Sequence, residues 1–170
     1  MPAGGSATAA AVAMAAALLE KAAVLSSKHW SGAAAAGSRA LELRLHAEGL
    51  VEEDAHAYLA FVDALRAAKG LTGEARARAV GPAHTKTVDV PLAIVRSAAE
   101  VVDLATMLAD HGNPNLRADA VVAATIAAAA GEAGAGLMAV NLSDAPGDPR
   151  LEEARRLATA AREKVAALRK

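Results

Sequence analysis

Long segments with few charges alternate with short segments rich in Gly, Pro, Asn and Asp along the whole chain. The long segments carry apolar stripes with helical spacing. The pattern predicts helices over approximately residues 7–27, 33–68, 74–80, 89–110, 116–140 and 149–170. The Gly81-Pro82 step is expected to end or kink the third of them, and Ser6 and Asp148 are expected to cap the first and the last. The sequence therefore predicts an all-α, up-and-down bundle of five to six helices, with residues 1–170 as a single domain.

Two of the predicted helices contain long stretches without any charged side chain. Residues 7–19 are uncharged, and so are residues 120–131. A helix that is apolar on nearly all sides is expected in the interior, so the segment around 120–131 is predicted to be the central helix. Alanine buries little apolar area, and one small domain covers such a helix incompletely. We therefore expect two copies of the chain to pair as a homodimer through helix faces.

The composition agrees with a helical protein and excludes several classes of function. Alanine, the strongest helix former, accounts for 50 of the 170 residues. The formal net charge is −1, with one Trp, one Tyr and one Phe, so a nucleic-acid surface is not expected. Cysteine is absent, which excludes disulfides and thiol nucleophiles, and the five histidines lack the spacing of metal ligands. We expect neither a secretory signal nor a membrane span, and hence a cytoplasmic location.

Three local features could carry chemistry. The run Gly4-Gly5-Ser6 opens a buried helix, where free N–H groups can hold an anion or a carbonyl oxygen, although an ordinary chain terminus has the same composition. Asn113 and Asn115 lie in a turn, where they offer amide groups to a ligand or serve the turn alone. Asp119 begins the most apolar helix, where it either complements the positive helix end or lies at the edge of a dry pocket.

These features belong to a longer series of matching segments. In chain order they are Pro2-Ala3-Gly4-Gly5-Ser6-Ala7; Asp54, Ala57, Tyr58 and Lys69; Val90-Pro91-Leu92; Gly112-Asn113-Pro114-Asn115-Leu116-Arg117-Ala118-Asp119; and Val140-Asn141-Leu142. Their order and spacing, from residue 2 to about residue 160, resemble the cyclodeaminase/cyclohydrolase family of folate enzymes. That family includes the methenyltetrahydrofolate cyclohydrolases and the cyclodeaminase domain of formiminotransferase-cyclodeaminase.

The resemblance implies a homodimeric enzyme that binds a tetrahydrofolate derivative and needs no metal and no cofactor beyond that substrate. The expected reaction is hydrolysis of 5,10-methenyltetrahydrofolate to formyltetrahydrofolate. Asp119 is implied as the catalytic residue, because a carboxylate can move protons and place a negative charge beside the cationic methenyl bridge. The implied substrate-binding residues are Gly4, Gly5, Ser6, Asn113, Asn115, Lys28 and Lys69, with the two lysines facing the carboxylates of the glutamate tail.

Two alternatives stay open. A formiminotetrahydrofolate cyclodeaminase closes the formimino group to the same methenyl bridge with loss of ammonia, but a single domain without a formiminotransferase half favours the cyclohydrolase. A non-catalytic helical dimer that keeps the fold is the second alternative. It is favoured by Ala3 and Ala118, where the family motifs carry Gly and Ser, and by a chain that starts directly at the glycine run.

Overall fold

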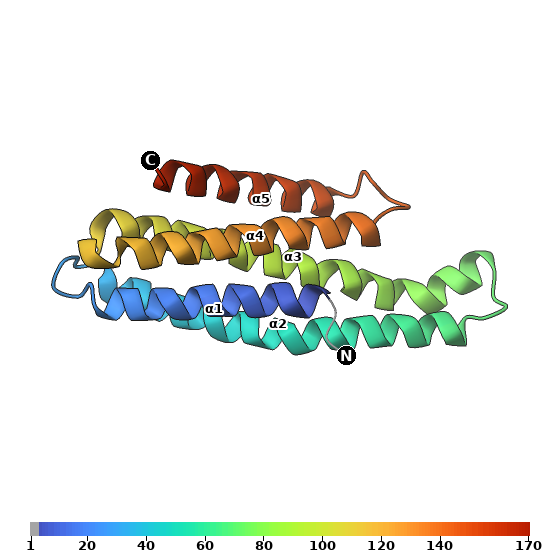
Figure 1. Ribbon diagram of the computed structural model, residues 1–170. Coiled ribbons are helices and arrows are strands. Elements are labelled where there is room, and N and C mark those ends of the chain that lie inside the picture. Colours follow the sequence, from blue (N-terminus) through green and yellow to red (C-terminus); the bar gives the residue numbers. More distant parts are fainter. Residues whose placement is uncertain (1–3) are drawn as a thin grey trace.

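The computed structural model describes residues 4–170, which form five α-helices and no β-strand. The helices are α1 (Gly4–Val24), α2 (Ala33–Ala67), α3 (Gly73–His111), α4 (Arg117–Asn141) and α5 (Pro149–Leu168), with a short 3-10 helix, η1 (Pro114–Leu116), before α4. Successive helices run up and down along one long axis, and the ends of α2 and α3 project beyond the other helices (Figure 1). The predicted all-α, up-and-down bundle is confirmed. Pro2 and Ala3 of the predicted opening motif lie outside the described residues.

Helix α4 is the central helix, as the uncharged stretch predicted. It packs against α1, α3 and α5, and its buried positions are almost all alanine and glycine. A Cβ atom placed on Gly134 would lie 2.8 Å from Val95 Cγ2 of α3, which is closer than real Cβ contacts. Small side chains therefore let the helix backbones approach closely, and this close approach replaces the burial of large side chains.

The expected end of a helix at Gly81-Pro82 is wrong, because α3 continues for 39 residues through both Pro82 and Pro91; the alternative expectation, a kink at this step, stays a prediction. Each proline removes the N–H that would donate to the carbonyl four residues earlier. For Pro91 that carbonyl is Thr87 O, and the side-chain Nδ2 of Asn141 donates to it instead, at 2.7 Å. For Pro82 it is the carbonyl of the exposed Arg78, which water can satisfy. A helix tolerates an internal proline where the freed carbonyl finds another donor.

The two ends expected to carry caps behave differently. Asp148 caps α5 as predicted, since its Oδ1 accepts from Arg150 N at 2.9 Å. The Arg150 side chain and this backbone N–H hold the pKa of Asp148 at about 2. Ser6 is not a cap, because α1 begins two residues before it, at Gly4. The cap of α1 comes instead from α2, where Asp54 Oδ2 accepts from Ser6 N at 2.7 Å.

Helix α1 and the stretch Pro114–Asn141 are each long and apolar enough to cross a membrane by length and composition, with a mean hydropathy of 1.5 in both. The expectation that the chain has no membrane span was based on the uncharged run of residues 7–19, which is shorter than these two segments. In the bundle, 44% and 50% of the two apolar windows are buried, and both helices supply much of the core. Core helices of soluble proteins pass the same test, so it is weak support for a membrane span.

Candidate functional site

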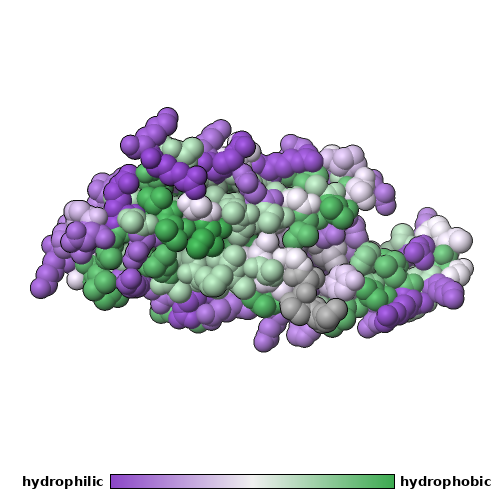
Figure 2. Space-filling view, in the orientation of Figure 1, coloured by the Kyte–Doolittle hydropathy of each residue, from purple (hydrophilic) through white to green (hydrophobic). Residues whose placement is uncertain are grey.

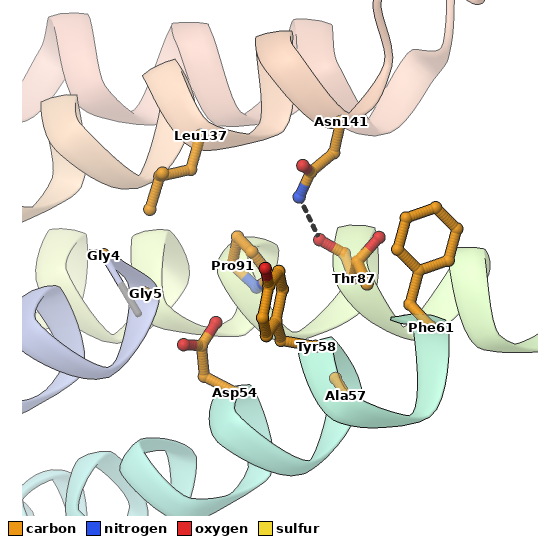
Figure 3. Close-up of a pocket in the computed structure, with 10 residues that line it drawn as sticks. All are labelled: Gly4, Gly5, Asp54, Ala57, Tyr58, Phe61, Thr87, Pro91, Leu137 and Asn141. Carbon is orange, nitrogen blue, oxygen red and sulfur yellow. Dashed lines mark hydrogen bonds between the residues drawn. The ribbon is translucent and has the colours of Figure 1, made fainter. Parts of the chain in front are cut away.

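A pocket of about 210 Å³ opens where the start of α1, the middle of α2 and α3, and the end of α4 meet (Figure 3). Its lining residues are Gly4, Gly5, Asp54, Ala57, Tyr58, Phe61, Thr87, Pro91, Leu137 and Asn141. The α2 residues recur at intervals of three and four, so they share one helix face. The walls are mainly apolar, and the polar groups converge from α2, α3 and α4. This combination is typical of a small-molecule site.

The carboxylate of Asp54 is the charged group of this pocket. Its Oδ2 accepts from Ser6 N at 2.7 Å and from Ser6 Oγ at 2.8 Å, and the residue is only 8% exposed. These two bonds fix the carboxylate against the positive end of α1, which stabilises a negative charge there. Asp54 is therefore held as an oriented acceptor at the inner end of the pocket.

The second oxygen of Asp54, Oδ1, accepts no hydrogen bond from residues 4–170. This atom lies against Gly5, where an added Cβ would be 2.0 Å from it, so only glycine permits this approach. An oriented oxygen beside an apolar wall can accept a proton from water or stabilise a neighbouring cation.

A second cavity, of about 380 Å³, continues from the pocket toward the projecting ends of α2 and α3. The two cavities share Phe61, Thr87 and Asn141, and the second also reaches Arg76. Arg76 Nη1 donates to the carbonyl of Ala68 at 3.3 Å, next to Lys69 in the sequence. A ligand longer than the first pocket can therefore extend along this arm toward Arg76, with Asp144 also lining this second cavity.

Three of the residues predicted from the sequence lie at this pocket. Gly4 and Gly5 line it, and Ser6 lies behind them and holds Asp54. Lys69 lies further along the same arm, in the connection between α2 and α3.

The other predicted residues lie at the opposite end of the bundle. Asp119 is in the first turn of α4 and pairs with Lys21 at 3.0 Å. At ~1.5 Å per residue, about 27 Å of α4 separates Asp119 from Leu137 in the pocket. Asn113 Oδ1 accepts from Asn115 N at 3.0 Å and so begins η1, while Lys28 lies in the neighbouring connection between α1 and α2. One chain alone does not bring this group to the glycine pocket, and the role of each of its members stays a prediction.

Asp54 and Asn141 are two of the eight pocket-lining residues that sequence reasoning did not assign to the site. Both stand in segments that carry the family resemblance, so a signal was present. The two residues could not be assigned to the site from the sequence, because the groups that they contact come from other helices. Ser6 is 48 positions from Asp54, and Thr87 is 54 positions from Asn141.

Within residues 4–170, no three His, Asp or Glu side chains come together where they could hold a metal ion. The expectation that no metal or further cofactor is needed stays a prediction.

Comparison with known proteins gives three findings. Residues 1–160 match the family described as Formiminotransferase-cyclodeaminase. A methenyltetrahydrofolate cyclohydrolase of Methylorubrum extorquens is 39% identical over 83 residues, which span 48% of this chain and 40% of that relative. The crystal structure of formiminotetrahydrofolate cyclodeaminase from Thermotoga maritima superposes with a TM-score of 0.83 at 22% identity, covering 98% of this chain and 87% of the other. The last similarity is one of fold.

Proposed function

The chain belongs to the formiminotransferase-cyclodeaminase family, and from this membership we propose that it acts in folate one-carbon metabolism. The proposed reaction is hydrolysis of 5,10-methenyltetrahydrofolate to formyltetrahydrofolate. The 39% identity to a methenyltetrahydrofolate cyclohydrolase over 83 residues supports this reaction.

The buried carboxylate of Asp54 is the observation that carries the proposal. The methenyl bridge is a delocalised cation, and a fixed carboxylate in an apolar pocket stabilises a cation strongly because little water screens it. Ser6 occupies one carboxylate oxygen, so the other is available to the reacting centre. Gly4 and Gly5 leave room for the ligand beside it.

The reaction needs one group that both accepts and returns a proton. Water adds to the methenyl carbon, forming the C–O bond, while its proton passes to Asp54 Oδ1. The carboxylic acid then gives this proton to one of the two bridging nitrogens as the bond between that nitrogen and the carbon breaks. The hydroxyl of the adduct releases its own proton to solvent in the same step, so its oxygen becomes the carbonyl of the formyl group on the other nitrogen. No metal or redox partner takes part in these steps.

The size of the pocket suggests how the substrate lies. A cavity of about 210 Å³ is smaller than a typical site for a drug-sized ligand, so we place only the reacting ring system in it. The rest of the molecule follows the second cavity toward Arg76. Lys69, at the end of that arm, is then the lysine placed to meet the tail carboxylates.

We also propose that the protein is a soluble, cytoplasmic homodimer that pairs through the α1–α4 face, the surface formed by the outer sides of α1 and α4. Apolar residues run along the middle of the face seen in Figure 2. Met14 of α1 and Val122 and Val140 of α4 are 63%, 50% and 72% exposed. If the two copies pack with their α4 helices antiparallel, Asp119 of the partner subunit lies at the pocket end of the first. In that arrangement the partner subunit's Asp119 can act at the pocket lined by Gly4, Gly5 and Asp54, as its predicted catalytic role requires.

Loss of methenyltetrahydrofolate absorbance, with and without the protein, tests the proposed reaction. Catalysed loss supports the hydrolase. Ammonia release from formiminotetrahydrofolate, with a rise in the same absorbance, would identify the deaminase, which the family description favours as the second candidate. Folate binding without either reaction would leave the non-catalytic helical dimer.

A further inference from the structure

The side-chain amide of Asn141 has a fixed direction at the end of α4. Its Nδ2 donates to Thr87 O at 2.7 Å, and its backbone oxygen lies 2.8 Å from His84 Nε2. A carbonyl oxygen can only accept, so the atom facing Thr87 must be the amide nitrogen. The amide oxygen therefore points away from Thr87, toward the side of the pocket where Leu137 lies (Figure 3).

The carbonyl that holds Asn141 is free because of Pro91. In an uninterrupted α-helix, the N–H of residue 91 would donate to the carbonyl of residue 87. Proline has no N–H, so Thr87 O needs another donor, and within residues 4–170 that donor is Asn141. Pro91, itself buried in the pocket wall, thus acts as a positioning residue for an amide on another helix.

We propose that Asn141 is a specificity-determining residue whose Oδ1 accepts a hydrogen bond from an N–H group on the ring of the substrate. The proposal rests on the proposed function, because the ring is the tetrahydropterin of the folate substrate. In this arrangement Asp54 faces the reacting bridge. Asn141 Oδ1 binds the ring, and the hydrogen bond from Asn141 Nδ2 to Thr87 O fixes the orientation of this acceptor. A pocket built this way selects a ring with an N–H donor over one that lacks it, since the lost bond leaves a polar group unpaired.

A set of variants separates this role from a purely structural one. Asn141→Ala removes both the ligand acceptor and the donor to Thr87 O, so we expect KM for methenyltetrahydrofolate to rise about tenfold, kcat to change little and the melting temperature to fall. In the double variant Pro91→Ala/Asn141→Ala, the new N–H of residue 91 can donate to Thr87 O. We expect the melting temperature to recover while KM stays high.

Pro91→Ala alone also tests the positioning step. The restored N–H competes for Thr87 O and releases the Asn141 amide, so KM rises, and combining it with Asn141→Ala adds no further increase. Pro82→Ala is the matched control. Pro82 lies in the same helix but outside the pocket, and no described side chain donates to the carbonyl that Pro82 leaves free. The KM of the Pro82→Ala variant should equal that of the parent.

Two results would overturn the inference while leaving the proposed function in place. In the first, the parent turns over substrate and the KM of the Asn141→Ala variant stays within about twofold of the parent's KM. In the second, the KM of the double variant recovers together with its melting temperature. A parent that neither binds nor turns over methenyltetrahydrofolate would overturn the proposed function and this inference with it.

Discussion

Ser6 donates two hydrogen bonds to one oxygen of Asp54, from its backbone N–H at 2.7 Å and from its hydroxyl at 2.8 Å. The pair joins the first turn of α1 to the middle of α2. It caps a helix that has no acidic residue in its first turn, and it leaves the second carboxylate oxygen without a hydrogen-bond donor from residues 4–170. One contact therefore both anchors a helix end and orients a reactive group.

Asp54→Asn should remove most of the hydrolase activity while keeping the bundle folded. The amide has nearly the same size, and its oxygen can still accept from Ser6, but it can neither take up a proton nor balance the cationic bridge. Positioned acid–base groups contribute ~10²–10⁴-fold to rate, so kcat should fall within that range. Initial rates of methenyltetrahydrofolate loss provide the measurement.

Asp63→Asn is the matched control for Asp54, because Asp63 lies on the same helix and, within residues 4–170, pairs only with the exposed Arg66, at 3.0 Å. It should turn over substrate at the parent rate. Equal rates for the Asp54 variant and the parent would show that the pocket carboxylate takes no part in the chemistry.

Gly5→Ala should lower both activity and thermal stability. The new Cβ would lie 2.0 Å from Asp54 Oδ1 and 2.5 Å from its Cγ, so the carboxylate must leave the bonds that Ser6 gives it. The sequence alone predicts that a side chain at Gly5 harms ligand binding more than folding. The structure adds a stability cost, because the displaced group also caps α1.

Gly49→Ala supplies the comparison for this glycine. Gly49 lies inside α2, and apart from the neighbouring backbone of its own helix no described atom lies within 4 Å of an added Cβ, so alanine should raise stability by up to about 1 kcal/mol. The melting temperatures of the Gly5→Ala and Gly49→Ala variants, each compared with the parent, measure the two effects. A Gly5→Ala protein as stable and as active as the parent would refute the close contact between Gly5 and Asp54.

The fold was more predictable than the site because helix patterns are local and the site is not. The uncharged stretch before Gly131 identified the central helix, and the Asp148-Pro149 step identified the start of α5. The predicted helix end at Gly81-Pro82 was wrong, because the sequence shows a helix breaker but not the surroundings that tolerate it. Sequence-based prediction also missed Asp54, which looks like an ordinary helical carboxylate until Ser6 of another helix lies against it.

Met14→Glu should convert the proposed dimer to monomers. Met14 is 63% exposed on the α1–α4 face, and a carboxylate buried between two copies would lack a partner there. Leu45→Glu is the control, since Leu45 is similarly exposed, at 54%, but lies on α2. Light scattering at micromolar concentration measures the outcome. A parent protein that is already monomeric would exclude the proposed dimer.

Asp119→Asn tests whether the aspartate predicted from the sequence acts in catalysis. A catalytic role predicts a fall in kcat of ~10²–10⁴-fold with the fold retained. A role limited to the exposed Lys21 pair predicts near-parent turnover and a stability loss below about 1 kcal/mol. If the catalytic role holds, the separation of Asp119 from the pocket means that Asp119 must come from the partner subunit.

Mixing two inactive variants then tests the shared site directly. In a dimer of one Asp54→Asn chain and one Asp119→Asn chain, one of the two sites combines both substitutions and the other has neither. Random exchange of subunits makes half of the dimers mixed, so the mixture should recover about a quarter of the parent activity. The same mixture made in the Met14→Glu background should recover none, because the chains cannot pair. Two inactive variants that stay inactive after proven subunit exchange would show that each site is built from a single chain.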